Sequence, residues 1–267
     1  ATIRRQRQMC IRDRPQVSAY LPSKGLVEKQ DIEKAITEYI TSQNIPAFMY
    51  YKDVSDIYSG IQTLVKRVIF EDVAKLVTSP ANHLEIERLA IRLAGSDEVN
   101  LQKLAGIIGM KREQIESNID LMCKAELLNV LLPYTGIDGK LNKNRKAFFM
   151  SPSIRAALLA VFYGTELPTQ FLSKLYEDTV VMYLKSTLTD GVLSFTSMAN
   201  SSNPDFVVET MGNPILIELG MGKTSGTQLK KSPVKHRYSI LVSGKFDRPE
   251  IDGNCLHLPL SLSLIHI

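Results

Sequence analysis

The chain has 267 residues, of which 44% are hydrophobic and 22% charged, a composition typical of globular proteins. Its length indicates two domains with room for part of a third. No apolar run approaches the roughly 18–20 residues of a membrane-spanning helix, and the N-terminus has no secretory signal pattern, so no membrane partner is expected. The three cysteines (Cys10, Cys123, Cys255) form neither an even disulfide set nor a CxxC metal pair, which predicts a cytoplasmic setting.

The formal net charge of +4 comes entirely from the first 14 residues, which hold five arginines against Asp13 alone. Residues 15–267 are therefore neutral, and bulk charge gives no support to nucleic-acid binding. The stretches 1–14 and 261–267 resemble translated sequencing-adapter sequence. Both are expected to be non-native tails, with the natural protein continuing past one or both ends; a frayed basic tail is the alternative for 1–14.

Residues 15–80 are predicted to be a helical segment. Asp31 can cap a first helix that has apolar side chains on one face, and Pro46 ends it because proline lacks a backbone N–H. A second helix is expected over 54–70, and its apolar stripe continues to the break at Ser79-Pro80. The segment has little capacity to form a core of its own.

Residues 81–150 have the element order of a winged-helix domain, three helices followed by a strand hairpin. The helices are expected over 82–94, 101–108 and 111–125. Lys111 and Arg112 begin the third helix and are candidates for nucleic-acid contact. The same helix carries Glu113, Glu116 and Asp120, and Glu126 follows directly after it. This mixed face favours a structural or protein-contact role over base reading.

Residues 151–260 change to a pattern of helix, strand, hairpin, crossover and strand, which predicts an α/β domain with a small mixed sheet. Helices are expected over 154–162 and 171–184, and short strands follow Gly191. The fold class predicted for the whole chain is α+β multi-domain, with a helical segment, a winged helix and then this α/β domain.

Three acidic residues of the α/β domain occupy positions suited to chemistry. Asp205 begins one strand, Glu218 lies near the end of the next between apolar neighbours, and Glu177 lies on the long helix. A hairpin can bring Asp205 and Glu218 together, and convergent carboxylates are the hard oxygen ligands that Mg²⁺ prefers. A cation held there can polarise a phosphodiester and lower the pKa of an attacking water.

Pro204-Asp205, a hairpin and Glu218 on the next strand resemble the PD-(D/E)XK nuclease motif. More broadly, residues 27–260 look like the C-terminal portion of a prokaryotic AAA-type ATPase family, in which a P-loop core precedes a winged helix and a restriction-endonuclease-like domain of unknown function. The resemblance implies that 15–80 is a remnant of the ATPase lid region. It also implies Asp205 and Glu218 as catalytic metal ligands, with Glu177 as an outer ligand or an orienting residue.

The chain departs from these families in two places. The motif requires a lysine two residues after the second acid, where this chain has Gly220; Lys223 is the expected substitute, provided that it can swing back across the glycines. No GxxxxGK[ST] occurs in the chain, so ATP binding is expected only in a region upstream.

Lys230 and Lys231 belong to the densest basic run in the interior of the sequence. This run is interpreted either as a solvated helix face or as a phosphate-contacting edge beside the acidic site.

Three hypotheses for the function of the chain follow. In the first, the chain is a fragment of an AAA-type ATPase family protein whose nuclease-like module binds nucleic acid or a partner without cutting. In the second it is an active Mg²⁺-dependent nuclease. In the third it is a regulatory module that binds another protein or forms homo-oligomers.

Overall fold

The computed structural model describes residues 29–73, 83–96, 98–142, 144–189, 191–196 and 203–261. The chain divides into two compact units, Ala1–Ala35 and Ile36–Ile267, and of the first unit only the beginning of one helix is described. The fold therefore belongs to the second unit. The predicted tail 1–14, and all of the predicted tail 261–267 except its first residue, lie outside the described residues.

The described part of the predicted segment 15–80 is built from helices and turns. These are α3 (Lys29–Glu38), the π-helical turn η1 (Tyr39–Gln43), the 3-10 turn η2 (Pro46–Phe48), α4 (Val54–Arg67) and the π-helical turn η3 (Val68–Val73). Helix α3 begins before Asp31, which lies in its first turn instead of at its cap. Asp53 caps α4, because its carboxylate accepts a 2.7 Å hydrogen bond from the Ser55 N–H.

Three helices and three strands follow. They are α5 (His83–Ala94), β1 (Glu98–Val99), α6 (Leu101–Ile108), α7 (Arg112–Lys124), β2 (Leu128–Pro133) and β3 (Arg145–Phe149). Strand β3 pairs antiparallel with both β1 and β2. Gly109 ends α6 at a φ of +77°, a conformation that glycine adopts without strain. The predicted polar turn between β2 and β3 contains a short helix, α8 (Ile137–Asn142).

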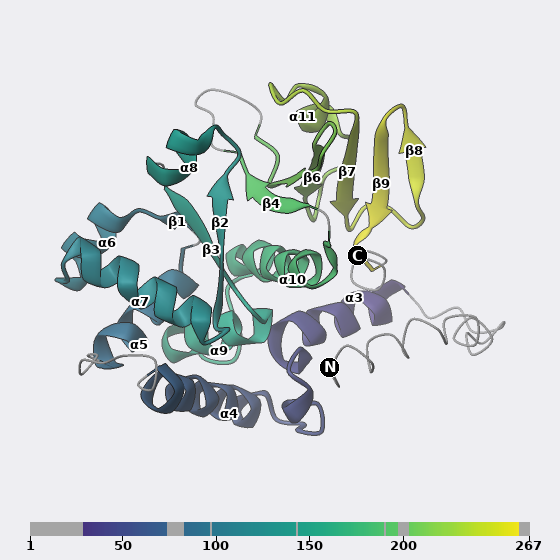
Figure 1. Ribbon diagram of the computed structural model, residues 1–267. Helices are drawn as coiled ribbons and strands as arrows, with labels where there is room; N and C mark the ends of the chain where they lie inside the picture. The colour runs from purple at the N-terminus through teal and green to yellow at the C-terminus, as the bar shows by residue number, and fades with distance from the viewer. Residues whose placement is uncertain are drawn as a thin grey trace. The chain divides into compact units, whose positions relative to one another are not determined.

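The remaining elements continue the same sheet. They are α9 (Pro152–Tyr163), the 3-10 turn η4 (Thr169–Phe171), α10 (Leu172–Thr187), β4 (Val192–Phe195), β5 (Phe206–Glu209), β6 (Ile215–Leu219), α11 (Thr227–Lys230), β7 (Tyr238–Ser243), β8 (Glu250–Asp252) and β9 (Cys255–Pro259). The strands β4, β5 and β6 form an antiparallel meander, whereas β6, β7 and β9 run parallel. The end of β2 pairs in parallel with β4, so the nine described strands form one mixed sheet in the order β1-β3-β2-β4-β5-β6-β7-β9-β8 (Figure 1). The mixed α and β class predicted from the sequence is confirmed.

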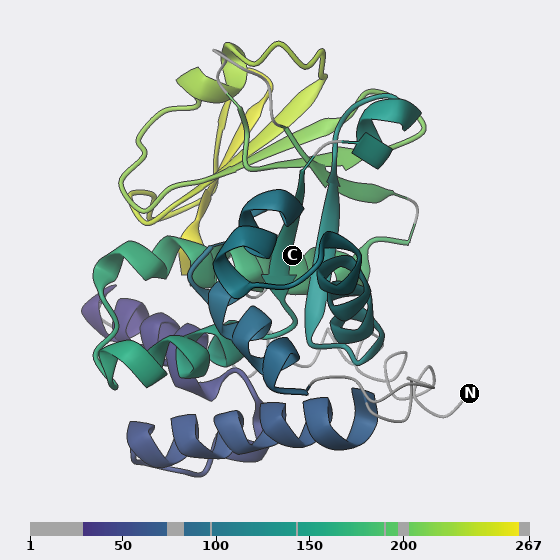
Figure 2. The ribbon, with the colours of Figure 1, turned by 90° about the vertical axis from the view of Figure 1, so that its left-hand side faces the viewer.

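Helices α10 and α11 cover opposite faces of the C-terminal strands (Figure 1). In the side view of Figure 2, the green helix α10 again lies along one side of these strands. Apolar side chains alternate accordingly: Ile217 of β6 belongs to the cluster that contains Val180 of α10, and its neighbour Leu216 to the cluster that contains Leu229 of α11. Successive strand residues point to opposite faces, which is why one strand supplies both cores.

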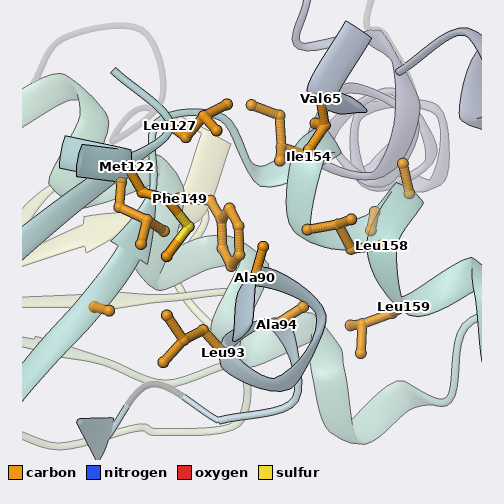
Figure 3. Packing of buried hydrophobic residues seen from close by; sticks show 14 of the residues in the cluster. Val65, Ala90, Leu93, Ala94, Met122, Leu127, Phe149, Ile154, Leu158 and Leu159 are labelled. Atoms are coloured by element: carbon orange, nitrogen blue, oxygen red, sulfur yellow. The ribbon is translucent and has the colours of Figure 1, made fainter. Parts of the chain in front are cut away.

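The largest hydrophobic cluster extends from Ile40 to Leu260 and crosses the boundaries predicted at 80/81 and 150/151. Figure 3 shows Val65 of α4 beside Ile154 of α9, and Phe149 of β3 beside Met122 of α7. Helix α9 contacts α4, α5 and α10. The helical segment therefore buries its apolar stripe against α9. None of the helices in the described ranges combines the length and apolar character needed to cross a bilayer.

One ion pair lies at the centre of this packing. Arg155 of α9 and Asp178 of α10 are both fully buried, and the guanidinium donates to both carboxylate oxygens, at 2.6 and 2.8 Å. The guanidinium also donates to the last carbonyls of α5, those of Leu93 and Ala94, and it lies over the ring of Phe149. The Phe149 N–H in turn donates to Asp178 at 2.9 Å. The pair thus ties α5, β3, α9 and α10 together with its charges and hydrogen-bonding groups satisfied.

Replacing one partner of this pair is expected to destabilise the protein strongly. Arg155→Met leaves the Asp178 carboxylate buried without its cation, and this should lower the free energy of unfolding by about 3–5 kcal/mol. Chemical denaturation followed by circular dichroism measures the change. The matched control is Arg67→Met, which removes an exposed i,i+4 pair with Glu71 and should leave the midpoint nearly unchanged. Equal effects of the two substitutions would contradict the structural role of the buried pair.

Candidate functional site

The register of the β5–β6 hairpin brings Asp205 and Glu218 to the same end of the sheet. Phe206 pairs with Ile217, which places Asp205, the residue just before β5, opposite Glu218. The Asp205 carboxylate accepts a 2.7 Å hydrogen bond from the Leu219 N–H. Glu218 is 1% exposed, and its Oε2 is buried and has no hydrogen-bond partner among the residues that the structure describes. A buried carboxylate oxygen with free coordination capacity is unusual and points to a ligand or cation.

Lys223 reaches this pair across a tight turn. Its N–H donates to the Gly220 carbonyl, and its ammonium forms an ion pair with Glu218 Oε1. The ammonium also donates to Gln228 Oε1 at 3.1 Å, and the Gln228 amide is held by the Asn203 carbonyl at 2.7 Å. The structure therefore brings together three predicted site residues, Asp205, Glu218 and Lys223.

Gly220 makes this approach possible. A Cβ at this position would lie 2.5 Å from both Cγ and Cδ of Lys223, closer than side-chain atoms approach one another. The glycine that occupies the lysine position of the PD-(D/E)XK pattern therefore lets the later lysine fold back. Sequence analysis missed Gln228, which fixes the lysine head group; its position on α11 gave no signal that it would face β6.

Glu177 does not join the other two acids. The described residues contain no group of three or more His, Cys, Asp or Glu side chains that could hold a metal ion. Glu177 lines a small pocket with Leu219 and Gly220 on the α10 side of the sheet, whereas Glu218 points to the α11 side. The alternation of side chains along β6 separates them.

The four predicted nucleic-acid contacts fall in two places. Lys111 and Arg112 are exposed at the start of α7, and Lys230 and Lys231 are exposed at the end of α11; the two helices lie apart in both views (Figures 1 and 2). Lys230 donates to Asp252 at 2.6 Å, and this hydrogen bond raises the pKa of the lysine and lowers that of the aspartate. The four residues therefore do not form one basic patch, and Lys230 has a carboxylate partner.

The chemistry of Asp205 and Glu218 fits a magnesium ion. Mg²⁺ is commonly held by one or two carboxylates and completes its coordination with water and substrate phosphate, so a third protein carboxylate is not required. The unpartnered Oε2 of Glu218 is the structural observation that supports this fit. The ion pair with Lys223 opposes it, because the ammonium neutralises part of the negative charge available to a cation.

Comparison with known proteins gives two sequence matches. The model of a domain of unknown function (DUF8612) matches residues 34–164, a range that ends before the strands carrying Asp205 and Glu218. The uncharacterized protein MJ1637 of Methanocaldococcus jannaschii is 26% identical over 239 residues, which cover 87% of this chain and 50% of that protein. The chain thus spans about half the length of this relative. Neither description states an activity.

Among solved structures, the comparison finds protein VC1899 from Vibrio cholerae, with 12% identity and a TM-score of 0.23 over 78% of this chain and 55% of that chain. A TM-score this low carries no argument about fold or function.

The dependence of Lys223 on Gly220 can be tested by a double-mutant cycle. Gly220→Ala should displace the lysine and leave the Glu218 carboxylate uncompensated, lowering the free energy of unfolding by about 1–3 kcal/mol. In a Lys223→Ala background the same substitution should cost much less, since the Cγ and Cδ that it meets are gone. Denaturant unfolding measures both. Gly222→Ala is the control, because nothing lies within 4 Å of its added Cβ; additive effects of the first two substitutions would contradict the coupling.

Proposed function

We propose that the open end of the β5–β6 hairpin, where Asp205 and Glu218 lie, is a divalent-cation-dependent site of the PD-(D/E)XK nuclease type that hydrolyses phosphodiesters. One observation carries the proposal: the buried Oε2 of Glu218 has no hydrogen-bond partner among the described residues, while the ammonium of Lys223, five residues after the acid instead of two, contacts Oε1. Asp205 lies opposite Glu218 through the hairpin register. Two acids and an amine, the groups that the motif requires, are thus present at one strand end.

Each residue has a distinct role in this proposal. Asp205 and Glu218 hold the cation, which when bound supplies a Lewis acid for the phosphodiester and its attacking water. The Leu219 N–H holds the Asp205 carboxylate in position. Lys223 provides positive charge where negative charge develops on the phosphate, and Gln228 orients its head group.

Helices α5, α6 and α7 with the β1-β3-β2 strands support a winged helix as the neighbouring module. Lys111 and Arg112 lie at the exposed beginning of its third helix, where a winged helix contacts nucleic acid or a partner protein. The restriction-endonuclease-like character of the later strands is supported by the meander β4–β6, the crossover through α11 and the parallel strand β7.

The place of this module in a larger protein forms part of the same proposal. The resemblance to AAA-type ATPases implies that a P-loop domain upstream binds ATP, and that the nuclease-like module acts under its control. The support is the resemblance itself, together with a relative about twice as long as the matched region.

A second candidate function is binding of nucleic acid without cleavage. The direct ion pair between Lys223 and Glu218 favours it, since the ammonium occupies the carboxylate that a cation requires. In that case the positive and negative groups neutralise each other, and the site contributes shape and hydrogen bonds instead of chemistry.

Cleavage of a labelled single- or double-stranded oligonucleotide in Mn²⁺ or Mg²⁺ distinguishes the two candidates. We expect cleavage that requires the cation and is lost in Asp205→Asn and Glu218→Gln, because each removes a charged oxygen ligand. Lys223→Met should lower the rate about 100-fold, as loss of one charge-stabilising donor does in other enzymes. Salt-sensitive oligonucleotide binding without cleavage would support the second candidate.

Glu177→Gln serves as the comparison variant, since Glu177 lies on the other face of the sheet. It should change the cleavage rate much less than Glu218→Gln. No cleavage by the folded, cation-saturated protein would overturn the hydrolytic proposal, and equal effects of Glu177→Gln and Glu218→Gln would show that the site is placed wrongly.

A further inference from the structure

A second feature of the fold is an apolar hollow far along the chain from Asp205 and Glu218. It has a volume of about 540 Å³ and lies between α5, α6, α9 and η4, the first three of which are labelled in Figure 1. Its apolar lining includes Ile91, Ile108, Leu159 and Phe171. Hollows of 300–1,000 Å³ with apolar walls and few polar groups are typical of binding sites.

Helix α5 contributes one open face to this hollow. Arg88, Ile91 and Arg92 line it at the i, i+3 and i+4 positions of the helix, and Gly95, the residue just after the helix, lines it as well. Gly95 has no side chain, which leaves the end of the groove uncovered. A helical stripe of this kind, with no helix of the described chain packed over it, is a surface shaped for another element.

The apolar surface continues beyond the hollow. Phe162 and Tyr163 at the end of α9 are 69% and 47% exposed and line its rim, and Ile107 of α6 is 53% exposed on the facing rim. A small ligand would fill the hollow and leave these side chains in water, whereas a protein element can cover them all.

The charge of the groove specifies the partner. Several arginines in the described part of the chain have carboxylate partners, such as Arg67 with Glu71 and Arg145 with Glu116, whereas Arg112 and Arg237 have no ion pair within the described residues. Within the described ranges, Arg88 and Arg92 form no such ion pair. They lie one turn apart on the same face of α5, a spacing that matches acidic residues one turn apart on an opposing helix.

We infer that the groove between α5, α6 and α9 binds an acidic amphipathic helix of a partner protein. The helix places its apolar stripe on the hollow and on Phe162 and Tyr163, and its acidic edge against Arg88 and Arg92. This is the helix-in-groove mode of recognition, in which anchors one turn apart give affinity and flanking charges give selectivity. The surface is independent of the Asp205–Glu218 site.

The test uses a fluorescent synthetic peptide of about 18 residues, long enough to be partly helical, with a leucine stripe flanked by glutamates. Binding is followed by fluorescence anisotropy at low and high salt. We expect the full chain to bind this peptide. A lysine-flanked peptide with the same leucine stripe should bind with roughly tenfold lower affinity. The preference should shrink as salt rises, because the rim charges are screened.

A charge exchange locates the binding. Arg88→Glu/Arg92→Glu should reverse the preference, so that the lysine-flanked peptide binds better than the glutamate-flanked one. The control Lys52→Glu/Lys124→Glu changes the net charge equally at exposed positions that do not line the groove, and it should leave the preference intact. Ile107→Ser should weaken both peptides, since it removes an exposed apolar contact. Thermal unfolding verifies that each variant is folded.

Three results would overturn the inference. Equal binding of the two peptides would show that the arginines do not select charge. An unchanged preference in Arg88→Glu/Arg92→Glu would place the peptide elsewhere. Arginine-dependent binding of decanoate without binding of either peptide would make the groove a pocket for a small amphipathic anion.

Discussion

The buried ion pair between Arg155 and Asp178 is the constraint on which the rest of the packing depends. Two charges can remain in a dry core only where geometry is close to ideal and further hydrogen bonds satisfy the remaining donors and acceptors. Here the other donors reach the C-terminal carbonyls of α5, and the carboxylate holds the backbone of β3 at Phe149. Four elements from both halves of the chain are therefore fixed in one arrangement, and α10 in particular is held beneath the sheet.

The position of α10 decides which side of the sheet is available for chemistry. Helix α10 covers the face to which Ile217 and Leu219 point, so Glu218 between them faces α11. On that side Lys223 and Gln228 approach through the Gly220 turn. The Arg155–Asp178 ion pair fixes the place of α10, and the alternation of side chains along β6 then directs Glu218 to the opposite face. The candidate site therefore needs only a few polar residues of its own.

Local patterns predicted those parts of this arrangement that depend on nearby residues. Apolar periodicity indicated α4 to α7 and α10, and the Pro204-Asp205 strand start with the following hairpin indicated the pairing of Asp205 with Glu218. The sequence also allowed the contact between Lys223 and Glu218 to be anticipated, because two glycines, Gly220 and Gly222, precede the lysine. Long-range contacts could not be predicted from the sequence. Arg155 is a single charged residue in an apolar helix, and nothing in the sequence indicates that its partner is Asp178, 23 residues later. The parallel pairing of β2 with β4 likewise depends on tertiary packing.

Adjacent acids illustrate why site residues are harder to predict than elements. Glu177 and Asp178 differ by one position on α10, about 100° around the helix, and the sequence alone does not say which of them faces the core. The structure buries Asp178 against Arg155 and places Glu177 at a small pocket near Leu219. Glu177, which the resemblance to the nuclease family implied as a metal ligand, therefore lies on the opposite side of the sheet from Glu218.

Manganese binding tests the central claim most directly, because it does not require a substrate. Electron paramagnetic resonance of free Mn²⁺ should lose intensity on addition of the protein, and the full signal should return in Asp205→Asn/Glu218→Gln. Glu177→Gln should bind as the unmodified chain does, since it lies on the other face. A signal unaffected by the unmodified protein, or equally reduced by the Asp205→Asn/Glu218→Gln variant, would contradict the assignment of these two carboxylates as a cation site.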